Sequence, residues 1–139
     1  MNELIYDRTQ SDVDYALNHQ DSSTDLKGAY NYSDLNRIET WCAYLATQLN
    51  SYNYSVNITT KTNWNMSDFP TKSELARIKN NVISLRDAFS AIASIPENME
   101  KMTYQKANQI EKAIYDLNLS LYGMISSFWY SGEVNAGEV

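Results

Sequence analysis

Apolar residues recur along three stretches of the chain in alternating steps of three and four residues. Such steps place side chains on one face of an α-helix, at the period of about 3.5 residues that is typical of left-handed helix bundles. The pattern therefore predicts three long amphipathic helices. Their apolar positions are Leu35, Ile38, Cys42, Leu45, Leu49 and Tyr52; then Leu75, Ile78, Val82, Leu85, Phe89 and Ile92; then Ala107, Ile110, Ile114, Leu117, Leu121, Met124 and Phe128.

Helix start and stop signals flank these stretches. Thr71 and Glu74 form a T-x-x-E pattern, in which each side chain can accept a hydrogen bond from the other residue's backbone amide. Ser33 precedes Asp34, which predicts a cap and a negative charge at the positive end of the helix dipole. Residues 95–98 (IPEN) are expected to separate the second long helix from the third, because proline does not continue a helix.

A shorter helix is expected to begin at Thr9, since Asp12 follows three residues later and can complete a cap. We expect this helix to bury Val13, Ala16 and Leu17. The predicted fold is thus mainly α, an antiparallel bundle of three long helices with a short N-terminal helix packed alongside. The length of 139 residues suits one domain, residues 1–139.

The segment between the first two long helices has a different period. Tyr54, Val56 and Ile58 alternate with small polar residues, and this period of two predicts a half-buried β-strand at residues 54–61. A single strand leaves its backbone groups unpaired, so it needs a partner. The two candidates are residues 4–6 (LIY) and the closing SGEVNAGEV, residues 131–139.

The closing segment repeats Gly-Glu-Val within eight residues. We expect Gly132 to end the last helix, because glycine adopts the left-handed conformation cheaply at a helix C-terminus. Beyond it, Val134 and Val139 lie among small residues that suit an extended tail on a strand edge. The alternative is a frayed terminus.

Charge and composition narrow the classes of partner. The net charge is −6 and no basic run occurs, so we expect no nucleic acid partner. No apolar stretch reaches the ~20 residues that span a bilayer, so we expect no membrane partner. The N-terminus lacks the basic and apolar regions of a signal peptide. One cysteine, Cys42, cannot form an internal disulfide or a Cys-based zinc site.

Candidate catalytic residues are few. His19 is the only histidine and falls near the end of the short helix, while Cys42 belongs to an apolar stripe and is expected in the core. Asp7, Asp12 and Asp14 cluster near the short helix, and paired acids can hydrolyse glycosides. No phosphate-binding loop or metal-ligand spacing occurs. We therefore expect no catalytic residues, no metal and no cofactor, and predict that the protein is not an enzyme.

The acidic and basic residues near the N-terminus have a structural interpretation that we favour. Asp12 is accounted for by capping at Thr9, and Asp7 can pair with Arg8 or Arg37. We predict a polar lock between the N-terminal segment and the first long helix, made by Asp7, Arg8, Asn36 and Arg37.

Aromatic residues also fall at or beyond the ends of the stripes. These are Tyr52, Tyr54, Trp64, Trp129 and Tyr130. Tyrosine and tryptophan among asparagine and serine suit protein interfaces and sugar stacking, so the set is a candidate interaction surface. The alternative is that these rings fill the ends of the bundle.

Four segments together resemble a small domain found in phage and prophage proteins of Gram-positive, often gut-dwelling, bacteria. They are IYDRTQSDVDYA, LKGAYNYSDLNRIETWCAYLA, YSVNITTKTNWNMSDFPTKSELARI and FWYSGEVNAGEV, and they cover nearly the whole chain in the same order. The matching residues are Asp7, Arg8, Thr9, Asp12, Val13, Lys27, Gly28, Ala29, Tyr30, Asn31, Asp34, Leu35, Asn36, Arg37, Trp64, Met66, Asp68, Pro70, Tyr130, Ser131, Gly132 and Glu133. Phe69 departs from the pattern, which usually has a smaller aliphatic residue there.

The resemblance implies a role in virion or tail structure, and it carries no catalytic residues. We therefore expect a non-enzymatic structural or attachment module that contacts other protein subunits, in a virion or by self-association. Its location would be the virion, or the bacterial cytoplasm before assembly. The alternative is a carbohydrate-binding module of a phage tail or cell-surface protein, which would bind a surface glycan through Tyr54, Trp64 and Tyr130.

Overall fold

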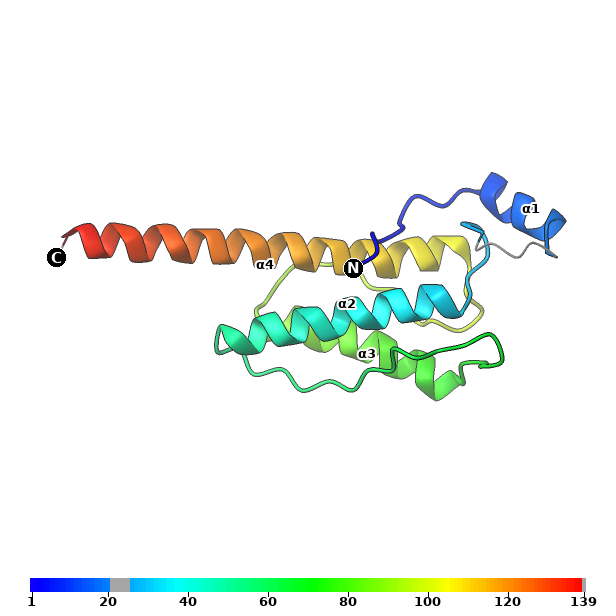
Figure 1. Cartoon of the computed structure of the whole chain (residues 1–139), viewed down its shortest axis with the longest axis horizontal. Coiled ribbons are helices and arrows are strands. Elements are labelled where there is room, and N and C mark those ends of the chain that lie inside the picture. The colour runs from blue at the N-terminus through cyan, green and yellow to red at the C-terminus, as the bar shows by residue number, and fades with distance from the viewer. Residues whose placement is uncertain (21–25, 139) are drawn as a thin grey trace.

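The computed structural model describes residues 1–20 and 26–138, with side chains described up to residue 127. Within these residues the chain forms four helices and no strand (Figure 1). They are α1 (Gln10–Asn18), α2 (Tyr32–Ser51), α3 (Lys72–Ala88) and α4 (Tyr104–Glu138). The mainly α prediction is therefore confirmed.

The helices α2, α3 and α4 pack around one core, as the three apolar stripes predict. The buried residues of the stripes are Leu35, Ile38, Cys42, Leu45, Leu49, Ile78, Val82, Leu85, Ala107, Ile110, Ile114, Leu117 and Leu121. Each long connecting segment adds one large side chain to this core, Trp64 from residues 52–71 and Met99 from residues 89–103.

The three long helices run in the same direction, so the antiparallel arrangement was wrong (Figure 1). Residues 52–71 return along the bundle after α2, and residues 89–103 return along it after α3. Side-chain contacts fix the first return: Asn50 bonds Val56 and Asn36 bonds Trp64, so this segment runs opposite to α2. At about 3.3 Å per extended residue, either segment can span a helix that rises only 1.5 Å per residue.

The predicted strand at 54–61 is also wrong, although its period of two is present. Alternate residues from Tyr52 to Ile58 are half-buried and those between them are exposed. Helix side chains take the place of a partner strand. Asn50 bonds both backbone groups of Val56, and Asn81 donates to the carbonyl of Thr59 at 2.6 Å. The segment is thus an extended chain laid on α2 and α3.

Helices α2 and α3 end in the same motif, and neither end uses glycine. Asn53 and Ser90 adopt left-handed φ angles of 71° and 56°. The amide of the next residue then bonds a carbonyl five residues back, Tyr54 to Leu49 and Ala91 to Arg86. Because α3 stops at Ala88, well before residues 95–98, Ile92 lies outside the helix and is 92% exposed.

The capping box of Thr71 with Glu74 is confirmed, and so is that of Thr9 with Asp12. The cap of α2 is Asn31 rather than Ser33, with Asp34 completing the box. In α1, Ala16 is buried, but Leu17 is 59% exposed because only one face of this short helix meets the bundle.

The last helix does not end at Gly132. Helix α4 is 35 residues long and continues to Glu138, so the backbone of residues 131–138 is helical and not an extended tail. Leu121 is its last buried residue among those whose side chains are described. Met124 and Ile125 still pack against the core, and beyond them α4 projects past the ends of α2 and α3 (Figure 1). At 1.5 Å per residue, the part after Ile125 is about 20 Å long.

Candidate functional site

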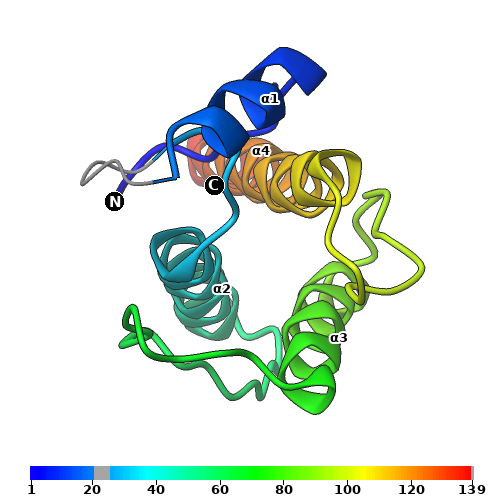
Figure 2. The same ribbon diagram turned by 90° about the vertical axis from the view of Figure 1, so that its right-hand side faces the viewer.

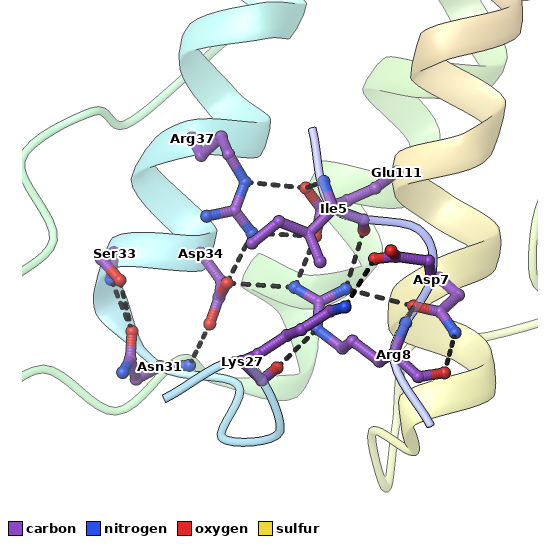
Figure 3. A network of polar contacts seen from close by, with 10 residues as sticks. Ile5, Asp7, Arg8, Lys27, Asn31, Ser33, Asp34, Arg37 and Glu111 are labelled. Carbon is purple, nitrogen blue, oxygen red and sulfur yellow. Dashed lines mark hydrogen bonds and ion pairs between the residues drawn. The ribbon is translucent and has the colours of Figure 1, made fainter. Parts of the chain in front are cut away.

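A buried ion-pair network joins the N-terminal segment to α2 and α4 (Figure 3). Arg8 donates to Glu111 at 2.7 Å and to Asp34 at 3.1 Å, and its side chain is 1% exposed. Arg37 makes two parallel bonds to Glu111, at 2.7 and 2.9 Å, and also pairs with Asp34. Two buried arginines thus meet two buried carboxylates, so the charges balance.

The same groups also bind the backbone. Glu111 accepts from the amide of Ile5 at 2.9 Å, and the second oxygen of Asp34 accepts from the amide of Asn31 at 2.8 Å. Asn108 bonds both backbone groups of Arg8, at 3.0 and 2.9 Å. Because these polar atoms are paired with one another and with the backbone, the network holds the N-terminal segment against α2 and α4.

Two of the four residues predicted for the polar lock, Arg8 and Arg37, lie in this network, and two lie elsewhere. Asp7 is 73% exposed and pairs with Lys27 at 3.0 Å, not with either arginine. Asn36 bonds both backbone groups of Trp64, at 2.8 and 2.9 Å. The acids that complete the network are Asp34 and Glu111.

A second buried acid, Glu39 of α2, lies at the centre of the contact between α2, α3 and the first return segment. It pairs with Arg77, accepts from the indole N–H of Trp64 at 2.5 Å, and accepts from the amide of Lys61 at 2.9 Å. Glu39 is fully buried and Trp64 is only 3% exposed. Trp64 therefore does not lie on an interaction surface, and the carbohydrate alternative loses its central residue.

The other aromatic residues of the predicted surface are placed differently. Tyr52 and Tyr54 are half-buried, and the Tyr54 ring packs edge-on against Phe89, 6.3 Å between centroids. This places Tyr54 among the rings that fill one end of the bundle. The side chains of Trp129 and Tyr130 lie outside the described residues.

The structure places each candidate catalytic group in a local contact. His19 caps α1, bonds the carbonyl of Tyr15 at 2.7 Å and stacks on its ring. Cys42 lies in the core, where burial and then the charge of Glu39 raise the pKa of its thiol to about 12. Asp14 accepts from Gln10, and Asp12 caps α1. Among the described residues, no cluster of acids, histidine and cysteine has metal-ligand geometry.

The sequence did not predict an apolar groove at the end of the molecule where α2, α3 and α4 begin. This end of the three helices faces the viewer in Figure 2. Its cavity volume is about 860 Å³, and residues of α1, of the turn before α2 and of segments 65–70 and 99–107 line it. Met66 and Phe69 line it while remaining 82% and 86% exposed. Such a volume with mainly apolar walls is typical of sites that bind ligands or partner side chains.

Tyr30 also lines this groove and lies against the ion-pair network. The guanidinium of Arg8 lies over its ring, 5.4 Å from the centroid. Its hydroxyl is buried and has no hydrogen-bond partner among the described residues. Burial, reinforced by the charges of Glu111 and Asp34, raises the pKa of Tyr30 well above its usual value. The ring therefore stays neutral at any physiological pH.

The charged residues that line the groove are already paired. Arg8 is held by the network, and Asp68 pairs with Lys61 at 3.7 Å and accepts from the amide of Asn65. The groove is therefore apolar and close to neutral, although the chain carries a net charge of −6.

No helix within residues 1–20 and 26–138 has the length and apolarity needed to cross a bilayer. No known protein family, no curated protein and no solved structure was found to match the chain.

Proposed function

We propose that this protein is a non-enzymatic structural module that assembles with other protein subunits, in the first place with copies of itself. The observation that carries the proposal is the projection of α4, which leaves the bundle after Ile125 and continues as helix to Glu138. A virion or tail-associated, phage-derived role is part of the proposal and rests on the sequence resemblance.

A single helix that projects into water is only marginally stable unless another protein surface packs against it. Isolated helices of fewer than about 12–15 residues are marginal, and most helical stability in proteins comes from burial of an apolar face. The projecting sequence includes Phe128, Trp129, Tyr130 and Val134. No charged residue occurs in α4 between Asp116 and Glu133. An aromatic-rich stretch of helix without charged residues is typical of an interface.

The non-enzymatic part of the proposal rests on how the reactive groups are engaged. Arg8, Arg37, Asp34 and Glu111 neutralise one another inside the protein, and Cys42 lies in the core with a raised pKa. Each of these groups has a structural role that accounts for its position.

Sedimentation equilibrium of the intact chain and of a chain truncated after Ser127 tests the proposal. The truncation keeps Met124 and Ile125, which pack against the core, so the bundle should unfold at a similar temperature. We expect the intact chain to assemble as its concentration rises and the truncated chain to stay monomeric. If both chains are monomers at every concentration, or if both assemble equally, the proposal fails.

A further inference from the structure

Resting on this proposed function, we propose that the apolar groove of one copy receives the projecting end of α4 from a second copy. The assembly would then be head-to-tail, with each molecule contributing a different surface to each contact.

The groove and the projection lie at opposite ends of the molecule. The groove lies where α2, α3 and α4 begin and is lined in part by α1; this end of the helices faces the viewer in Figure 2. Because the three helices are parallel, the C-terminal end of α4 emerges at the other end (Figure 1). A contact between two different surfaces at opposite ends repeats without closing unless a rotation brings the ends together, so it produces chains of subunits.

The two surfaces match in charge and in apolar character. Within the groove, Arg8 and Asp68 are already paired, so docking would desolvate no unpaired groove charge, while Glu133 and Glu138 of the incoming helix would have to stay outside the groove. Residues 117–132 of α4 contain no charged side chain. Burying charges without partners would be costly, whereas apolar surface on both sides favours contact.

The shape and flexibility of the groove also suit a helix end with large rings. Its volume of about 860 Å³ lies within the range of roughly 300–1,000 Å³ that is usual for binding pockets. Met66, Met99 and Met102 line it, and methionine side chains adapt to the shape of a partner. The exposed Phe69 and Met66 would be covered by the incoming helix, which accounts for two large apolar side chains in water.

The main competing arrangement is the pairing of two projecting helices along their lengths. That contact would use the same surface on both molecules and would stop at a dimer. It would leave the groove uncovered. The two arrangements therefore differ in whether groove substitutions change assembly.

A mixing experiment with two full-length variants separates them. The groove variant is Met66→Glu with Phe69→Glu, both at highly exposed positions. The tail variant replaces Phe128, Trp129 and Tyr130 by glutamine, which is neutral and favours helix. A third variant, Ile92→Glu, changes an exposed apolar residue outside the groove and serves as the matched control.

By sedimentation velocity, we expect the groove variant and the tail variant each to remain monomeric. Their equimolar mixture should form a dimer and stop there, with twice the monomer mass, because one supplies the tail and the other the groove. The control should assemble like the intact chain. If the groove variant alone assembles like the intact chain, the groove is not the docking site and this inference fails, while assembly through α4 stands. If the intact chain is monomeric, the proposed function fails first.

Discussion

Arg8 and Glu111 lie 103 positions apart in the sequence and meet inside the protein, with 2.7 Å between the guanidinium nitrogen and the carboxylate oxygen. Through this contact the N-terminal segment is held against α4 (Figure 3). The arrangement makes Glu111 the residue on which the N-terminal segment most depends.

Replacing Glu111 by glutamine should therefore be strongly destabilising. The change leaves Arg8 and Arg37 buried with one carboxylate between them, and removing one partner of a buried ion pair costs about 3–5 kcal/mol. Urea unfolding measures the loss, and hydrogen exchange at the amide of Ile5 reports release of the N-terminal segment. Asp116→Asn, which breaks an exposed pair with Lys112 on the same helix, is the control and should change little. An equal effect of both variants would contradict the role given to the network.

Trp64→Phe should lower the free energy of unfolding by about 1–3 kcal/mol, because it leaves the buried Glu39 without one of its donors. The matched control is Trp41→Phe. The indole of Trp41 also donates a hydrogen bond, to the carbonyl of Asn2 at 2.9 Å, but in an exposed setting, so its loss should be smaller. If the two variants unfold at the same urea concentration, the buried hydrogen bond from Trp64 to Glu39 does not stabilise the fold more than the exposed bond of Trp41.

Two glycines should respond in opposite ways to alanine. A Cβ at Gly28 would overlap the backbone of Asp12 and Val13, so Gly28→Ala must push α1 away from the bundle, at a cost of about 1–3 kcal/mol. A Cβ at Gly123 meets nothing, and alanine is the better helix former by about 0.5–1 kcal/mol. Thermal unfolding of the two variants should thus show a lowered and a raised midpoint. A neutral Gly28→Ala would show that α1 does not pack closely there.

Stability should decline at alkaline pH. The pKa of the Cys42 thiol is raised to about 12 in the folded protein, against roughly 8.5 for a free thiol. The unfolded chain therefore loses this proton first, and the free energy of unfolding falls as pH rises from about 8.5 toward 12. Tyr30, with its raised pKa, adds a loss of the same sign at higher pH. Cys42→Ala and Tyr30→Phe should each flatten the decline measured by urea unfolding; unchanged slopes would contradict these assignments.

Much of the helical core was predictable because it follows from local spacing. Each stripe residue from Leu35 to Leu49 is buried, and so is each from Ala107 to Leu121. The end of α3 was missed because its signal is weak. Ser90 takes the left-handed position that sequence rules assign to glycine, so the apolar spacing continued past the true end.

The direction of the helices was missed although the sequence contained a signal for it. Antiparallel neighbours need only short loops. The long segments 52–71 and 89–103 each have enough residues to return along the bundle, which lets the next helix start at the same end. The length of both segments, and the period of two in the first, indicated extended returns and therefore parallel helices.

The ion-pair network could be predicted only in part, because its partners are distant in sequence. Arg8 and Arg37 were identified, but nothing local connects them with Glu111. A weak signal existed: Glu39 and Glu111 each directly follow a stripe residue, Ile38 and Ile110, which places them at the edge of the core. The groove could not be foreseen, since it needs four segments that come together only in the fold.

Small-angle X-ray scattering over a series of concentrations tests the central claim, head-to-tail assembly through α4 and the groove, most directly. The claim predicts that mass and maximum dimension increase together with concentration, while the cross-sectional radius of gyration stays that of a single molecule. A particle that stops at two copies with a thicker cross-section, or a monomer at every concentration, would contradict it.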